Sequence, residues 1–129
     1  MSTNSLRPRP AIILLVEHNH TLSVVRDVLE FAGWYVKESD AVYARAMLEC
    51  GEHFDLLIID NDGRYSGLEL TRLVRRLPQR KKMPIIFISL EDLTQEAGAA
   101  GADAFLRKPN NLIELVDTIR RLLGETRPV

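Results

Sequence analysis

The chain has 129 residues, a net charge of −1 at pH 7 and 46% hydrophobic residues. This length and composition are typical of one globular domain with its own core. The balanced charge provides no global field toward nucleic acid or a membrane surface, so neither kind of partner is expected. The single cysteine, Cys50, excludes an internal disulfide, which suits a reducing cytoplasm, and we expect it to be buried. No apolar run approaches the roughly 20 residues of a membrane span.

The first half of the chain predicts two strands and two helices in alternation. Residues 11–16 form a continuous apolar run without alternation, as in a strand that is buried on both faces. Apolar positions over 22–32 recur at helical spacing. Residues 34–38 predict a weaker strand at an edge of the sheet. A second helix is expected over 41–50, with Asp40 as its N-cap.

The second half continues the same alternation. Proline at position 78 and glycine at position 98 mark a helix end and a weak helix respectively. The predicted strands cover 54–59, 84–88 and 104–106, and the predicted helices cover 68–77, 91–100 and 112–123.

Five strand–helix units predict an α/β fold with a five-stranded parallel sheet and helices on both faces. Right-handed crossovers favour the flavodoxin-like strand order 2-1-3-4-5. We expect residues 1–10 to be a flexible N-terminal lead-in without the apolar core of a signal peptide, residues 11–124 to form the domain, and residues 125–129 to form a short C-terminal tail.

Polar residues of different chemical types follow four of the predicted strands. Glu17 and His18 follow the first strand, Asp60 ends the third, Ser89 ends the fourth and Lys108 follows the fifth. A single carboxylate at a strand end usually just begins a loop. Four strand ends that together provide an acidic group, a nucleophile, a hydroxyl and a cation indicate a site at the carboxyl edge of the sheet.

This ordered set resembles the receiver domains of bacterial two-component response regulators, from residue 11 to about residue 123. Receivers carry an acidic pair after the first strand, an aspartate ending the third, a Ser or Thr ending the fourth and Lys-Pro after the fifth. The segments that carry the resemblance are Val16-Glu17-His18-Asn19, Leu57-Ile58-Ile59-Asp60, Gly67-Leu68-Glu69-Leu70, Ile88-Ser89 and Gly101-Ala102-Asp103-Ala104-Phe105-Leu106-Arg107-Lys108-Pro109.

The resemblance implies that Asp60 accepts a phosphoryl group from a histidine kinase or a phosphotransfer protein. Lys108 would pair with the phosphate as a point charge, and Ser89 would hydrogen-bond one of its oxygens. Ser89 and Phe105 would form the switch that changes the signalling surface, although a plain core aromatic is an equal interpretation of Phe105. The output would pass to a downstream protein or to an effector domain outside this chain, and a homodimer is also considered.

The implied Mg²⁺ site differs from the family pattern at one position. Glu17, Asp60 and the backbone carbonyl of Asp62 would be ligands, because Mg²⁺ prefers oxygen donors. His18 stands where the family has a second acidic residue. A neutral imidazole supplies no negative charge and suits other metals better, so we expect Mg²⁺ binding to be weak or absent.

Two alternatives to a phospho-accepting receiver therefore stay open. One is a pseudo-receiver that keeps the fold and signals by protein contact without phosphate. The other is a small metal-binding sensor or enzyme that uses Glu17, His18, His20 and Asp60. The favoured interpretation is a signalling module in the cytoplasm rather than an enzyme.

A basic cluster surrounds the end of the predicted helix over 68–77. The expected role of these side chains is to complement the helix dipole in solvent, and the alternative is to bind an acidic partner or nucleic acid. Direct DNA binding is not expected, because no recognition helix is evident. The cluster consists of Arg72, Arg75, Arg76, Arg80, Lys81 and Lys82.

Overall fold

The computed structural model of the chain describes residues 10–17, 23–61 and 66–125. Five parallel strands form one sheet in the order β2-β1-β3-β4-β5, so the predicted topology and the edge position of β2 are confirmed. The strands are β1 (Ile12–Val16), β2 (Tyr35–Ser39), β3 (Leu56–Asn61), β4 (Ile85–Ser89) and β5 (Ala104–Arg107). The α-helices are α1 (Val24–Phe31), α2 (Ala41–Glu49), α3 (Gly67–Arg76), α4 (Thr94–Ala100) and α5 (Leu115–Leu123).

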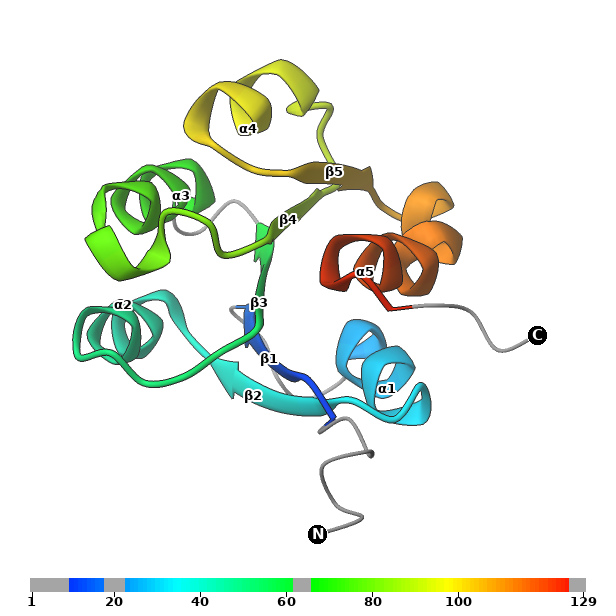
Figure 1. Cartoon of the computed structure of the whole chain (residues 1–129). Helices are drawn as coiled ribbons and strands as arrows, with labels where there is room; N and C mark the ends of the chain where they lie inside the picture. The colour runs from blue at the N-terminus through cyan, green and yellow to red at the C-terminus, as the bar shows by residue number, and fades with distance from the viewer. Residues whose placement is uncertain (1–9, 18–22, 62–65, 126–129) are drawn as a thin grey trace, which may run out of the picture.

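The sheet lies between two layers of helices (Figure 1): α1 and α5 cover one face, and α2, α3 and α4 cover the other. Side chains alternate between the two faces along each strand. Ile13 and Ile58 therefore belong to the core beneath α1 and α5, whereas Leu14 and Leu57 belong to the core beneath α2 and α3. Because these strands are buried on both faces, they are continuously apolar rather than alternating. Each fully buried side chain of this kind contributes about 1.5–3 kcal/mol.

Short polar side chains cap the N-termini of three of the helices. Ser23, Asp40 and Ser66 accept hydrogen bonds from backbone N–H groups in the first turns of α1, α2 and α3, at 3.0, 2.8 and 3.1 Å respectively. Such a cap is worth about 1 kcal/mol. The predicted cap at Asp40 is therefore confirmed.

Several predicted boundaries are wrong by a few residues. The α4 helix begins at Thr94 rather than at residue 91, because Asp92 accepts hydrogen bonds from the Thr94 N–H and hydroxyl in a preceding turn. The α5 helix begins at Leu115 rather than at residue 112, because a 3₁₀ segment, Asn110–Glu114, precedes it.

Cys50, predicted to be buried, is exposed at the C-terminal end of α2. None of the helices in the described part of the chain is long and apolar enough to cross a bilayer.

Two arginines of the predicted basic cluster are structural rather than solvated. Arg80 is 5% exposed, lies in the 3₁₀ segment Pro78–Arg80 and donates hydrogen bonds to the backbone carbonyls of Leu48 and Glu52. Arg75 donates to the Gly101 carbonyl at 2.8 Å and pairs with Asp103 at 2.7 Å. These arginines tie α3 and the segment after it to the elements on either side, so the expectation of a solvated helix end is wrong for both.

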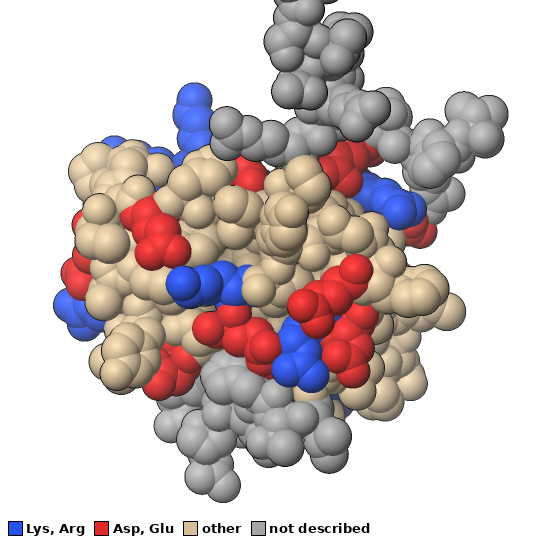
Figure 2. Space-filling model, turned by 90° about the horizontal axis from the view of Figure 1, so that it is seen from below, with Lys and Arg blue, Asp and Glu red and all other residues tan. Residues whose placement is uncertain are grey.

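The face that carries the β2 edge bears charges of both signs (Figure 2). There Arg26 of α1 lies 3.1 Å from Glu38 of β2 and 3.2 Å from Asp27. Its hydrogen bonds to Glu38 and then to Asp27 raise the pKa of the guanidinium above its ordinary value. This arrangement joins the first helix to the edge strand through charge-assisted hydrogen bonds.

Candidate functional site

Strand register brings the predicted site residues to one edge of the sheet. Val16 of β1 pairs with Ile59 of β3, so the next residues along these strands, Glu17 and Asp60, come to the same level. Since neighbouring strands lie about 4.8 Å apart, two carboxylates are held side by side at this edge. Two of the predicted site residues therefore lie at the same edge of the sheet.

The fourth and fifth strands bring a hydroxyl and a cation to the same edge. Ser89 ends β4 and pairs in register with Arg107 of β5, and the Lys108 N–H donates to the Ser89 carbonyl at 2.8 Å. The Lys108 ammonium reaches the Asp60 carboxylate, with 2.6 Å between Nζ and Oδ1. The peptide bond between Lys108 and Pro109 is cis.

The polar side chains of this edge are almost completely buried. Glu17, Asp60 and Ser89 are 4%, 7% and 2% exposed. Removing a carboxylate from water is costly unless opposite charge or hydrogen bonds compensate for it. The Lys108 ammonium supplies such compensation to Asp60, and it keeps contact with solvent because its side chain is 22% exposed. The site thus contains a buried carboxylate beside a partly accessible cation.

Asn61 is a site-forming residue that the sequence pattern did not single out. Its Oδ1 accepts a hydrogen bond of 3.1 Å from the N–H of Gly67, the first residue of α3. A Cβ at Gly67 would lie 2.8 Å from Ile59 Cγ2 and 2.9 Å from Phe87 Cε2, closer than real Cβ contacts allow. Glycine therefore allows α3 to begin directly against the residue that follows Asp60. The sequence signal for this was the Ser-Gly pair at the start of the predicted helix.

The donor set of the edge fits a hard cation. Glu17 and Asp60 provide two buried carboxylates at the ends of adjacent strands, and carboxylate oxygens are the ligands that Mg²⁺ prefers. Among residues 10–17, 23–61 and 66–125, no three His, Cys, Asp or Glu side chains gather as a metal cluster. The predicted contributions of His18, His20 and the Asp62 carbonyl lie outside the described residues.

Phe105 packs against the core between the sheet and its α2–α3 layer. It is partly buried, and its ring stacks on that of Phe87, with 6.2 Å between the centroids and 22° between the planes. The Phe87 ring is in turn one of the groups that a Cβ at position 67 would contact too closely, so it is part of the reason for glycine there. Phe105 is therefore joined through one neighbouring ring to the start of α3.

The proteins that are similar to this chain in sequence or structure include response regulators and receiver domains. The response regulator MprA of Mycobacterium avium is 34% identical over 122 residues, which cover 90% of this chain and 52% of that protein. The chemotaxis response regulator CheY4 of Vibrio cholerae has a TM-score of 0.77 at 29% identity, covering 88% of this chain and 99% of that one. The receiver domain of sensor histidine kinase PA1611 from Pseudomonas aeruginosa, with magnesium coordinated in its active-site cleft, has a TM-score of 0.77 at 26% identity and covers 91% and 100%.

The similarity extends over most of the chain but not over most of every relative. The chain spans about half the length of MprA and 12% of the protein RcaC of Microchaete diplosiphon. The family model of the response regulator receiver domain matches residues 12–120, from the first strand to the middle of the last helix. The chain therefore belongs to the response regulator receiver domain family, whose members typically accept a phosphoryl group and signal in two-component systems.

Proposed function

We propose that Asp60 of this chain accepts a phosphoryl group from a phosphohistidine on a histidine kinase or phosphotransfer protein. The observation that supports this most directly is the 2.6 Å contact between Lys108 Nζ and Asp60 Oδ1 at the carboxyl edge of the sheet. A cation in that position can neutralise phosphate charge. Signalling then passes by protein contact to a downstream protein or to an effector domain outside this chain.

In the proposed reaction a carboxylate oxygen of Asp60 attacks phosphorus and forms an acyl phosphate. The bond between phosphorus and the histidine nitrogen breaks, its electron pair returns to the imidazole, and the imidazole takes up a proton. Phosphoryl transfer depends mainly on alignment and charge neutralisation. Lys108 supplies a positive charge that can move from the carboxylate to a phosphate oxygen. Ser89, whose hydroxyl oxygen accepts from the Glu91 N–H at 3.1 Å, can still donate its hydroxyl proton to the phosphate.

Mg²⁺ would be held by Glu17 and Asp60, together with the predicted carbonyl of Asp62. When bound, it supplies charge that offsets repulsion between the phosphate and the two carboxylates. The magnesium described for the related PA1611 receiver supports this assignment. Because His18 replaces an acidic residue, we propose that the affinity for Mg²⁺ is lower than with two acidic residues after β1.

A small-molecule phosphoryl donor tests the proposal without knowledge of the natural kinase. The chain is incubated with acetyl phosphate and Mg²⁺, and intact-mass spectrometry measures the addition of one phosphoryl group. We expect the addition in the wild type and its loss in Asp60→Asn, whereas Asp55→Asn, at the residue directly before the same strand, serves as the matched control.

A wild-type protein that stays unmodified at high Mg²⁺ would refute the proposal for the natural chain. The His18→Asp variant then distinguishes the causes. Modification in His18→Asp alone would show that His18 turns this receiver into a pseudo-receiver. No modification in either would leave Asp60 as a structural member of an interaction module.

A further inference from the structure

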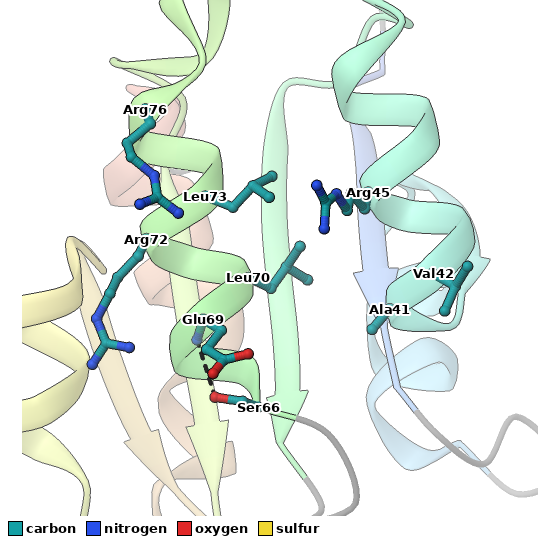
Figure 3. A pocket seen from close by; sticks show the side chains of 9 residues that line it. All are labelled: Ala41, Val42, Arg45, Ser66, Glu69, Leu70, Arg72, Leu73 and Arg76. Carbon is teal, nitrogen blue, oxygen red and sulfur yellow. Dashed lines mark hydrogen bonds between the residues drawn. The ribbon is translucent and has the colours of Figure 1, made fainter.

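A groove between α2 and α3 forms a surface that the phosphoryl-transfer site does not use. Its volume is about 630 Å³, and it lies on the helical layer of the sheet formed by α2 and α3 (Figure 3). The residues that line it are Ala41, Val42, Arg45, Ser66, Glu69, Leu70, Arg72, Leu73 and Arg76.

The floor of the groove is apolar. Leu70 and Leu73 point from α3 toward α2 (Figure 3), and Val42, which is 78% exposed, adds an apolar side chain to the lining from α2. An exposed valine and two leucines in the lining of one groove provide apolar surface that a partner could cover. With nine and ten residues, α2 and α3 are about 14–15 Å long, which matches two to three turns of a docked helix.

The rim of the groove is basic although the whole chain carries a net charge of −1. Arg45 reaches in from α2, and Arg72 and Arg76 lie one turn apart on α3 (Figure 3). Arg45 also contacts Glu49 at 3.4 Å on its own helix. Among the described residues that line the groove, Glu69 is the one acidic residue, and it lies toward the N-terminal end of α3. Positive charge is therefore concentrated here, beyond the first turn of α3.

We propose that this groove, called the α2–α3 groove, binds an acidic amphipathic helix of a partner protein. Apolar side chains of that helix would cover Val42, Leu70 and Leu73, and its Asp or Glu side chains would face the arginines. This is the helix-in-groove mode of recognition, with anchors at i, i+3 or i+4, and i+7. A protein helix fits better than nucleic acid because the floor is apolar and Glu69 would repel a phosphate backbone.

The test uses a designed fluorescent peptide rather than an unidentified partner. The peptide has 15 residues, a leucine stripe at helical spacing and flanking glutamates, and a second peptide carries lysines in their place. Fluorescence anisotropy at low and moderate salt measures binding to the full chain. We expect the acidic peptide to bind at least tenfold more tightly than the lysine peptide. We also expect its affinity to fall as salt screens the charges.

Charge-reversal variants locate the binding site. Arg76→Glu should weaken the binding of the acidic peptide about fivefold or more, as expected when a surface ion pair becomes a repulsion. The matched control is Arg121→Glu, because Arg121 is an exposed arginine in the last turn of α5, as Arg76 is in that of α3. Val42→Asp, a change at an exposed residue, should also weaken binding. Amide chemical shifts should move along α2 and α3.

Several results would overturn the proposal. Equal effects of Arg76→Glu and Arg121→Glu, or shifts scattered over the whole surface, would indicate nonspecific attraction to positive charge. Binding of a labelled single-stranded oligonucleotide that depends on Arg76, without binding of the acidic peptide, would replace the protein partner by nucleic acid. Because none of the described residues that line the groove belongs to the phosphoryl-transfer site, Asp60→Asn should bind the peptide as the wild type does, and the two proposals can fail separately.

Discussion

The ion pair between Lys108 and Asp60 gives the sharpest stability prediction. The two groups are 2.6 Å apart, and their side chains are 22% and 10% exposed. At an effective dielectric constant of about 20, their Coulomb attraction is about 6 kcal/mol. Desolvation of the two ions costs several kcal/mol each, so the net contribution of the intact pair is small.

Removing only the cation leaves the other charge in place. In Lys108→Met, the Asp60 carboxylate stays buried at the same edge as Glu17. Loss of one partner of a buried pair costs about 3–5 kcal/mol, and the partial exposure of this pair reduces the expected loss to about 2–3 kcal/mol. That is a large fraction of the 5–15 kcal/mol that stabilises an ordinary domain.

Removing the anion is less costly. In Asp60→Asn, Lys108 keeps a flexible stem and an ammonium that already contacts solvent, so the expected loss is about 1 kcal/mol or less. The double variant Lys108→Met, Asp60→Asn contains neither charge. Its stability should therefore lie near that of Asp60→Asn, with a coupling energy of about 2 kcal/mol.

Urea unfolding, followed by far-ultraviolet circular dichroism in EDTA, measures these free energies without a bound divalent ion. The slope of the unfolding free energy against urea should be the same for all four proteins, since the surface exposed on unfolding is the same. Purely additive losses in the double variant, or a Lys108→Met protein as stable as the wild type, would refute the claim that Lys108 stabilises a buried carboxylate.

Other substitutions test separate parts of the structure. Gly67→Ala should destabilise the chain by about 1–3 kcal/mol in urea unfolding, because its Cβ would enter the space of two core side chains, whereas Gly98→Ala, with open space around it, should not. Arg80→Met should cost about 2–3 kcal/mol by the same measurement, because two backbone carbonyls lose a charged donor. His18→Asp should raise the affinity for Mg²⁺, measured by calorimetry with Asp60→Asn as the background that lacks one ligand. Asp92 accepts hydrogen bonds from Thr94, and these lower the pKa of Asp92, the side-chain hydrogen bond more than the backbone one. At pH values above the ordinary pKa of Asp they therefore stabilise the turn before α4 in full. This stabilisation is lost as the pH falls through the lowered pKa. Amide spectra of that turn recorded down to acidic pH should follow this change, and Asp92→Asn should show none of it.

Local pattern was sufficient for the architecture and for much of the candidate site. Continuous apolar runs identified the central strands, because a strand covered on both faces has no solvent side to mark with polar residues. The order of Glu17, Asp60, Ser89 and Lys108 along the chain identified one edge, because parallel strands all end at the same side of the sheet.

Helix boundaries and the roles of single polar residues could not be predicted from the sequence. The start of α5 depends on a 3₁₀ segment after the cis Lys108-Pro109 bond, and apolar spacing alone does not separate that segment from an α-helix. Arg80 looked like any other member of a basic cluster. Its burial depends on carbonyls of Leu48 and Glu52, which lie about 30 residues earlier in the chain.

The sequence by itself determined which residues are apolar, which are charged, and in what order they follow the strands. Only the tertiary structure decided which charges meet. The Lys108 ammonium after β5 contacts Asp60 of β3, although β4 lies between these two strands. Asn61 accepts a hydrogen bond from the Gly67 N–H at the start of α3. The physical reason is that periodicity reports the environment of a residue along its own element, whereas a pairwise contact depends on the packing of elements that are distant in the chain.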